Sequence, residues 1–444
     1  MTDESSGMST ASQPAAVTKD DRKHLQQIAD PQTGIITGIR RVSVPPGEPA
    51  IDSYVVEREE FTPFTDGNAM ARDEGGAAFS DEAARVATYG EAIERYCGCV
   101  YRDEALRTEA YDALDEPALD PTAVVNFAAQ QRASMADNTA LCGTDDDIAW
   151  VAGVDLQTER TTYIPAQLVY LSYPPAAEPF IRNPISTGLA AGTDRAMAIH
   201  NGLAECLERD AFMIYYLTAT ELPVIDLETT PPRIQRLARR VTAHGLGLTI
   251  LDATTDCGIP VAIAVVDDRE HRPAVTVAAA AGIDPSAVIE AAIAEVIQTR
   301  ISTVHRLATT TRSAEEMAAS EIDSFRDRAL LWADHDKLDE LAFWLDSDRT
   351  TTFDRFASVE HTDPVDAVTT AGYDVYAVDI TTRDIASLGV TVQRVLVPRL
   401  QPLYLVERLR YFGGDRLARV PVEMGYRDTL LPAAERNTMP HPFP

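Results

Sequence analysis

Three short stretches of the chain carry residues that could do chemistry. They span 91–95, 205–209 and 295–300; the first two read E-x-x-E-R and the third reads E-x-x-Q-x-R. On a helix, residues three and four positions apart lie on one face. Carboxylate oxygens are the ligands that Mg²⁺ prefers, and the planar arginine fork matches phosphate. Each stretch could therefore hold a divalent cation and a phosphate group together.

A small-residue segment and a capping residue precede each stretch. The small-residue segments are 75–79, 188–192 and 279–283. Ser80, Thr193 and Asp284 are good helix N-caps and lie 11, 12 and 11 residues before the first Glu of their stretch. Proline at 285 is tolerated in a first helical turn. The sequence thus predicts three copies of one unit: a small-residue turn, a capped Ala-rich helix and a polar cluster about three turns further on.

A single E-x-x-E-R more often marks a solvated helix face than a site. Here apolar residues surround the first two stretches: Ala92, Ile93, Tyr96, Cys97, Leu203, Ala204, Cys206, Leu207, Ala211 and Phe212. Such helices are too apolar for full exposure. We therefore expect the charged groups to line an internal cleft.

The charge of the chain is strongly negative. Its 444 residues include 69 Asp and Glu against 39 Lys and Arg, a net charge of −30. This disfavours binding to nucleic acid or to anionic membranes. Lysine occurs only as Lys19, Lys23 and Lys337. Excess carboxylate with few lysines favours adaptation to a high-salt cytoplasm, where screening weakens self-repulsion; a merely acidic mesophilic protein is the alternative.

The sequence shows no sign of export. The polar N-terminus lacks the apolar core of a signal peptide, and no uninterrupted apolar run reaches the roughly 18 residues of a membrane span. Five scattered cysteines are too few for a disulfide framework. These features predict a cytoplasmic protein.

Strand-like patterns alternate with the helices, at 34–38, 53–56, 148–154, 246–252, 260–266, 373–379 and 390–397. Their order lacks regular βαβ repeats. The predicted fold is α+β, a single large domain with repeated helices flanking β-sheets around a cleft. We expect a disordered N-terminal segment (1–33), a catalytic domain (34–426) with exposed charged helices over 313–347, and an extended tail (427–444).

Prolines alternate at the end of the chain, at Pro440, Pro442 and Pro444. Such a segment is pre-set to an extended conformation. A frayed terminus is one interpretation, but strict alternation up to the last residue favours a docked tail. Because the tail lacks apolar periodicity, we expect it to serve catalysis rather than folding, and its deletion to leave the melting temperature nearly unchanged.

Common nucleotide-binding and hydrolase motifs, such as G-x-x-x-x-G-K-[ST] and G-x-S-x-G, are absent. The repeats resemble the YcaO superfamily, and the P-x-P-x-P ending resembles its azoline-forming members, which modify thiazole- and oxazole-containing peptides. The resemblance rests on 186–192 with 202–211, on 75–77 with 90–96, on 379–382 and on 395–403. With the lysine depletion, it indicates a haloarchaeal member.

The resemblance implies ATP and Mg²⁺ as cofactors in a cleft without a P-loop. Glu91, Glu94, Glu205 and Glu208 would hold Mg²⁺. Arg209 and Arg300 would bind phosphates, Glu295 and Gln298 would complete the third wall of the site, and the three tail prolines would serve catalysis. The chain departs from the family pattern at Thr193, where Asn is frequent, and at Met197, where an acidic residue is common. Thr193 still offers an oxygen, whereas Met197 cannot replace a carboxylate at a hard cation.

The implied activity is ATP-dependent cyclodehydration of a ribosomal peptide to thiazoline or oxazoline. The alternatives are a thioamide-forming YcaO enzyme that works with a sulfur-delivery partner, and a catalytically silent ATP-binding regulator. Because residues 1–33 are too short for a leader-binding domain, we expect a separate partner protein to capture the leader of the precursor peptide. We also expect a homodimer.

Overall fold

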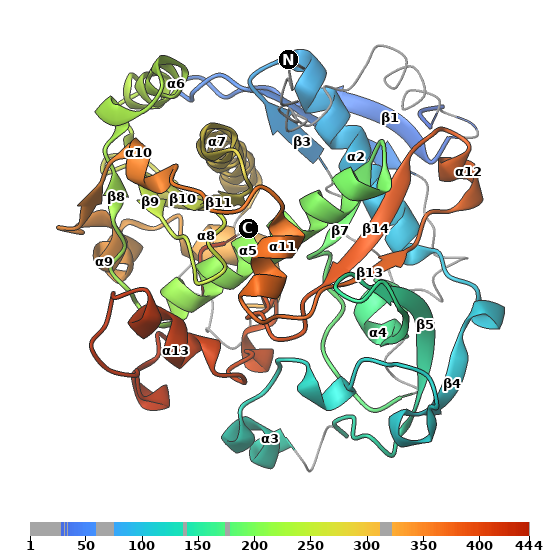
Figure 1. Ribbon diagram of the computed structural model, residues 1–444. Coiled ribbons are helices and arrows are strands. Elements are labelled where there is room, and N and C mark those ends of the chain that lie inside the picture. Colours follow the sequence, from blue (N-terminus) through green and yellow to red (C-terminus); the bar gives the residue numbers. More distant parts are fainter. Residues whose placement is uncertain are drawn as a thin grey trace, which may run out of the picture.

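We describe the protein from a computed structural model, which covers residues 28–58 apart from 31 and 33, 75–135, 140–173, 178–310 and 322–443. Most of the N-terminal segment expected to be disordered, part of the stretch 313–347 and Pro444 lie outside these residues. The described chain mixes helices with three separate sheets (Figure 1), which confirms the predicted α+β class.

The smallest sheet is antiparallel, in the order β1 (Ile36–Arg41), β2 (Asp52–Arg58), β3 (Gly75–Ala78). A five-stranded sheet has the order β11 (Val275–Ala281), β10 (Val261–Asp267), β9 (Gly247–Asp252), β8 (Val224–Ile225), β12 (Thr350–Thr351). The largest sheet has the order β4 (Arg107–Ala110), β5 (Asp147–Asp155), β13 (Tyr376–Asp379), β14 (Thr391–Leu396), β7 (Leu189–Gly192), and β6 (Thr161–Pro165) pairs with β5.

Each repeated unit is a strand at the end of its sheet followed by a long helix. The strands β3, β7 and β11 lead into α2 (Asp81–Cys99), α5 (Arg195–Leu217) and α7 (Pro285–Thr309). The small-residue segments expected to form turns are therefore strands. Small residues are needed there because the helix folds back closely: a Cβ on Gly76 would lie 2.6 Å from the Thr88 amide nitrogen.

The N-caps make the repeat regular. The side chains of Ser80, Asp194 and Asp284 accept hydrogen bonds from first-turn amides of α2, α5 and α7. The expectation that Thr193 caps the second helix is wrong. The N-cap is Asp194, whose carboxylate accepts a hydrogen bond from the Met197 amide at 2.8 Å. With this correction, each cap lies 11 residues before Glu91, Glu205 or Glu295.

The three units close into a ring. Besides its own strand, α2 packs on β7, α5 packs on β11, and α7 packs on β3. In Figure 1, α5 lies in the middle of the molecule, with α7 toward the five-stranded sheet and α2 toward β7. Since each helix carries its polar cluster at the same distance from its cap, the ring brings the three clusters toward one place.

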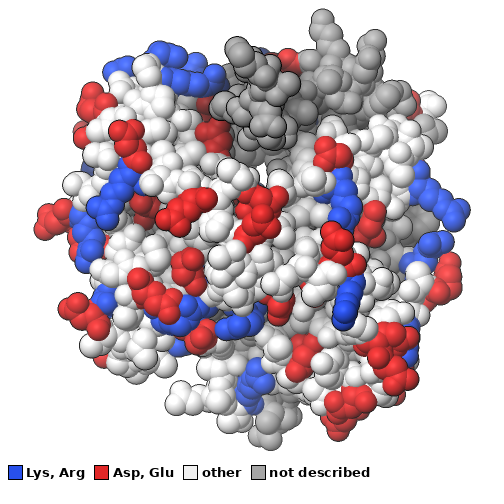
Figure 2. Space-filling view, in the orientation of Figure 1, with Lys and Arg blue, Asp and Glu red and all other residues white. Residues whose placement is uncertain are grey.

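The shorter helices are α3 (Ala129–Met135), α4 (Ala166–Val169), α6 (Pro232–Thr242), α8 (Phe325–Leu331), α9 (Ala342–Leu345), α10 (Phe353–Phe356), α11 (Pro364–Thr370), α12 (Arg383–Ala386) and α13 (Arg416–Glu423). Of these, α11 and α13 pack on α5, and α6 and α8 pack on α7. None of the described helices is long and apolar enough to cross a membrane. Asp and Glu side chains are spread over the face shown in Figure 2, with Arg and Lys between them.

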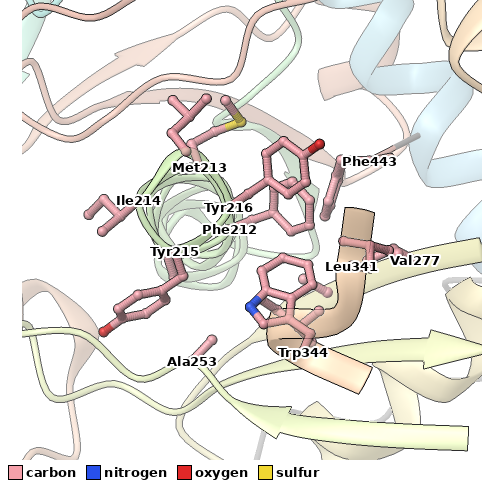
Figure 3. Close-up of a cluster of buried hydrophobic side chains, with 14 of the residues drawn as sticks. Phe212, Met213, Ile214, Tyr215, Tyr216, Ala253, Val277, Leu341, Trp344 and Phe443 are labelled. Atoms are coloured by element: carbon pink, nitrogen blue, oxygen red, sulfur yellow. The ribbon is translucent and has the colours of Figure 1, made fainter. Parts of the chain in front are cut away.

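The largest core cluster lies between the C-terminal half of α5, the five-stranded sheet and the end of the chain. Trp332 and Trp344 are buried in it, so the helices expected to be exposed over 313–347 are not exposed around these residues. Phe443 is fully buried and contacts Phe212 with ring centres 4.4 Å apart (Figure 3). The tail is therefore a core element, contrary to the expectation that it does not contribute to folding.

Candidate active site

The first two repeats line a polar pocket of about 190 Å³. Its walls come from α2, α5 and the segment around β7: Glu91, Glu94, Arg95, Ser186, Leu189, Ala190, Asn201 and Glu205. Three of the four residues expected to hold Mg²⁺ thus face one cavity.

Backbone amides beside and within β7 hold two of these carboxylates in place. The Glu94 carboxylate accepts a hydrogen bond from the Ala191 amide at 2.7 Å. The Glu205 carboxylate accepts one from the Gly188 amide at 2.9 Å. Glu91 forms an ion pair with Arg95 at 2.7 Å, one helical turn away. A strand of the second repeat therefore positions carboxylates from both the first and the second helix.

A second cluster of charged side chains lies next to the pocket carboxylates and consists of Glu208, Arg209 and Glu295. Arg209 lies 3.4 Å from a carboxylate oxygen of Glu205 and 3.4 Å from one of Glu208. The pKa of Glu295 is raised to about 7, chiefly by burial; Arg209 lowers it, and the charges of Glu205 and Glu91 raise it. Glu295 on α7 is thus an electrostatic neighbour of groups on both other repeat helices.

The pKa values of these carboxyl groups are raised because the site brings several negative charges together away from water. Burial raises the pKa of Glu94, and Glu91 and Glu205 raise it further. Burial likewise raises the pKa of Glu208, although Arg209 opposes the shift. A bound cation would reverse this balance by favouring the ionised carboxylates.

Three polar atoms beside the pocket keep unused hydrogen-bonding capacity. Within the described part of the chain, Glu208 Oε1 and Arg209 Nε and Nη1 are buried and make no hydrogen bond, although Glu208 Oε1 and Arg209 Nε form a 3.4 Å ion pair with each other. Buried polar groups normally make hydrogen bonds, so these atoms fit a bound cation and phosphate. No group of three or more described His, Cys, Asp or Glu side chains is arranged closely enough to form a metal site by itself. Carboxylate oxygens together with phosphate oxygens suit a bound Mg²⁺.

Arg300 does not join this site. Its guanidinium donates to Glu48 at 2.6 Å, to Asp268 at 2.8 Å and to the Pro273 carbonyl oxygen at 2.8 Å, using all three nitrogens. Arg95 and Arg209 follow the first Glu of their stretch by four positions, but Arg300 follows Glu295 by five. A residue four positions further along a helix lies about 40° around the axis from the first residue, whereas a residue five positions further along lies about 140° away. Arg300 therefore points to a different side of α7 from Glu295. Arg300 is therefore placed as a buried structural cation and not, as expected, as a phosphate ligand.

The remaining expected residues lie around the site in different ways. Thr193 follows β7, and its hydroxyl lies 3.6 Å from the Met197 sulfur. Gln298 is partly buried on α7, one turn after Glu295. Pro440 and Pro442 are buried in the docked tail, and Pro444 lies outside the described residues.

The tail reaches the site through Phe443. The Phe443 ring centre lies 4.3 Å from the guanidinium carbon of Arg209. Upstream, the Pro440 carbonyl oxygen accepts hydrogen bonds from Trp332 at 2.9 Å and from Tyr216 at 3.1 Å. The end of the chain is thus fastened in the core and contacts the arginine of the second repeat.

Ser186 and Asn201 line the pocket but were not among the expected site residues, and Arg95 was expected only as part of the first polar stretch and not as a named ligand. The sequence did contain a signal for two of them. Asn201 precedes Glu205 by four residues, and Arg95 follows Glu91 by four, so each shares a helix face with a predicted ligand. Ser186 lies in a loop, where no periodicity marks it.

A mixed fold with a cleft rich in carboxylates and an arginine beside it fits a protein that binds a nucleotide together with a divalent cation. The family model for YcaO cyclodehydratases, which bind ATP and Mg²⁺, matches residues 75–401. The chain belongs to the YcaO family.

The chain is also similar to other proteins in sequence and in fold. An uncharacterized protein of Methanothermobacter thermautotrophicus is 28% identical over 339 residues, which cover 72% of this chain and 79% of that protein. The structure of a heterocyclase in complex with substrate and cofactor shares the fold with a TM-score of 0.78 at 23% identity. It aligns with 96% of this chain, which spans 57% of that longer protein.

The YcaO protein of Methanopyrus kandleri, bound with AMPPCP and Mg²⁺, also shares the fold. Its TM-score is 0.62 at 20% identity, over 89% of this chain and 92% of that one. At these identities, both structural similarities establish the fold alone.

Proposed function

We propose that this chain is an ATP-dependent peptide cyclodehydratase that forms thiazoline or oxazoline in a ribosomal peptide. The observation that carries the proposal is the convergence of the repeat clusters. Glu91, Glu94 and Glu205 line one pocket, and Arg209 beside it has two buried nitrogens without hydrogen bonds. The family's ATP and Mg²⁺ binding supplies the chemical setting.

Each group has a role that its surroundings support. Glu91, Glu94, Glu205 and Glu208 would hold Mg²⁺. Bound MgATP supplies the phosphoryl group that turns the peptide amide oxygen into a leaving group. Arg209, which makes no hydrogen bond at Nε or Nη1, would stabilise negative charge on phosphate. Glu295, with its pKa near neutrality, can hold or release a proton there.

The overall chemistry balances without a redox partner. A Cys, Ser or Thr side chain of the peptide attacks the preceding carbonyl carbon and loses its proton, and the resulting oxyanion takes the γ-phosphoryl group as ADP leaves. The C–O bond then breaks with release of phosphate, and the amide nitrogen loses its proton to form C=N. The site therefore needs a peptide, ATP and a base, but no electron carrier.

Two alternatives share the nucleotide site. A thioamide-forming enzyme would replace the amide oxygen by sulfur from a delivery partner. A regulator would bind ATP without turnover. We propose further that the peptide reaches the enzyme with a separate leader-binding partner and that the enzyme acts as a cytoplasmic homodimer.

Co-expression with any short Cys/Ser/Thr-rich peptide that is found encoded beside its gene tests the proposal. Peptide that loses the mass of water, together with peptide-dependent phosphate release, is the expected result. Peptide whose oxygen is exchanged for sulfur would favour the thioamide alternative. ATP binding without peptide-dependent phosphate release would favour the regulator. A Glu205→Gln chain provides the inactive control.

A further inference from the structure

Two buried arginines of this protein lack the carboxylate partners that the others have. Five of the arginines that the structure describes are buried: Arg182, Arg300, Arg328, Arg394 and Arg416. Arg300 pairs with Glu48 and Asp268, Arg328 pairs with Glu407, and Arg416 pairs with Asp210 and Asp256. Among the described residues, no ion pair joins Arg182 or Arg394 to a carboxylate. Arg182 and Arg394 therefore differ from the other three buried arginines in having no carboxylate that neutralises their charge by direct contact.

Arg394 lies on β14 and is 2% exposed. Its Nε donates to the Leu168 carbonyl oxygen at 3.0 Å, whereas its buried Nη1 has no hydrogen-bond partner in the described structure. The pKa of Arg394 is lowered to about 10, chiefly by burial; the charges of Arg182 and Arg95 also lower it, whereas those of Cys206 and Glu205 raise it. The charge of Arg394 is therefore held at a desolvation cost that no neighbouring carboxylate offsets by direct contact.

Arg182 lies in the segment before β7 and is 8% exposed. Burial lowers its pKa as well. Cys206 is an electrostatic neighbour of both arginines, and its thiol lies 3.7 Å from the carbonyl oxygen of Val395, the residue after Arg394. The two guanidinium groups therefore share one region, between the segment before β7 and β14.

This region adjoins the active-site pocket. Arg394 is the ladder partner of Leu189, which lines the pocket. Cys206 directly follows Glu205, another lining residue, and the Glu205 and Arg95 charges both act on Arg394. The arginine pair therefore lies beside the carboxylate cluster, close to where the nucleotide's phosphates are proposed to bind.

Two like charges out of water are stable together only when an opposite charge or strong hydrogen bonds compensate them. Planar guanidinium groups match the oxygens of phosphate. We propose that Arg182 and Arg394 form a second, anion-binding wall of the active site that takes a phosphate-type oxyanion. The anion is either the phosphoryl group on the peptide amide oxygen or the phosphate released from it. This inference rests on the proposed function.

Thermal melts of the full-length chain test the pair with inorganic phosphate as the probe. Potassium phosphate replaces KCl at constant ionic strength, with and without MgADP. The wild-type melting temperature should rise with phosphate. Arg394→Gln and Arg182→Gln should each lose most of the rise, and Arg394→Lys should keep part of it. Arg239→Gln, which changes an exposed arginine on α6, reports the general stabilisation by phosphate.

The baseline melt separates a binding role from a structural one. Removing an uncompensated buried charge should leave the phosphate-free melting temperature of Arg394→Gln unchanged or raised. A lower baseline with an undiminished phosphate shift would overturn the proposal, as would equal shifts in all variants. A shift that needs MgADP would place the bound phosphate beside the nucleotide, where the transferred phosphoryl group would lie, and a shift without it would show that the two arginines bind free phosphate by themselves. MgATP-induced shifts, measured in parallel, test the proposed nucleotide site separately.

Discussion

The guanidinium carbon of Arg209 lies 4.3 Å from the centre of the Phe443 ring. This contact joins the second repeat to the penultimate residue of the chain, more than two hundred residues later. The ring also packs on Phe212, one turn further along α5 than Arg209. Phe443 therefore orients Arg209, which is proposed to bind phosphate, and also fills part of the core.

Phe443→Ala should lower both stability and nucleotide affinity. Truncating a buried Phe removes apolar contacts and leaves a cavity, which costs about 3–5 kcal/mol. The lost ring contact should also free the Arg209 side chain. Denaturant unfolding and calorimetry with MgATP measure the two effects. Phe325→Ala is the matched control, because Phe325 is 39% exposed. Equal stability of the two variants would contradict the buried position of the tail.

Arg416 should be needed to keep Asp210 buried. Asp210, directly after Arg209, is fully buried and accepts two hydrogen bonds from Arg416, at 2.8 and 2.6 Å. Arg416→Met leaves that charge unpaired, and breaking a buried pair costs about 3–5 kcal/mol. In denaturant unfolding, the double variant Arg416→Met with Asp210→Asn should recover part of this loss. No recovery would show that the two side chains do not act as a pair.

Magnesium affinity should rise with pH through neutrality. Glu295, whose pKa is about 7, and Glu94 and Glu208, whose pKa values are raised, must lose protons to bind a cation. We therefore expect tighter MgATP binding at about pH 8 than at about pH 6, with protons released on binding. Calorimetry in buffers of different ionisation enthalpy measures both quantities. Glu295→Gln should flatten the pH dependence.

The same carboxylates predict how the stability of the ligand-free protein changes with pH. The pKa of Glu295 is higher in the folded protein than its ordinary value, so its contribution to stability is fully present in acid. It is lost as the pH rises from about 4.5 toward about 7. Added Mg²⁺ and ATP should restore the loss, and thermal melts across this range with and without the ligand measure it.

Stability should also depend strongly on salt. The net charge is −30, and Asp and Glu are spread over the surface in Figure 2. Screening by added salt reduces the resulting repulsion. Thermal melts in KCl should therefore rise steeply from low to molar concentration. A flat series would show that the acidic composition is not an adaptation to high salt.

The sequence predicted the repeat helices well because their signals are local. The caps Ser80 and Asp284, the small-residue segments and the spacing of the glutamates all lie within single units. Thr193 and Asp194 are both capping types at adjacent positions, so composition alone could not choose between them. The segments before the helices were read as turns because Gly and Ala disfavour strands, but close packing of the helices requires such residues there.

The remaining differences come from contacts distant in sequence. Glu48 and Asp268, which bind Arg300, lie far from it along the chain. Likewise, no residue close to the tail in sequence predicts that Trp332 donates a hydrogen bond to Pro440 or that Phe212 packs on Phe443. Alternating prolines indicated an extended segment, but the buried His441 and Phe443 between them make it part of the core. The pairing of Arg182 with Arg394 is also a product of the fold, since neither has a sequence neighbour that marks it.

Calorimetric titration with MgATP tests the central claim most directly, namely that the repeat helices build one nucleotide site. The variants are Glu91→Gln on α2 and Glu205→Gln on α5, with Glu290→Gln as the control. Glu290 lies on α7 but pairs with Arg233 near the surface. We predict that both site variants lose at least about tenfold in affinity, roughly 1.4 kcal/mol, while Glu290→Gln binds as the wild type and all three melt as folded proteins. Unchanged affinity in both Glu91→Gln and Glu205→Gln would contradict the account.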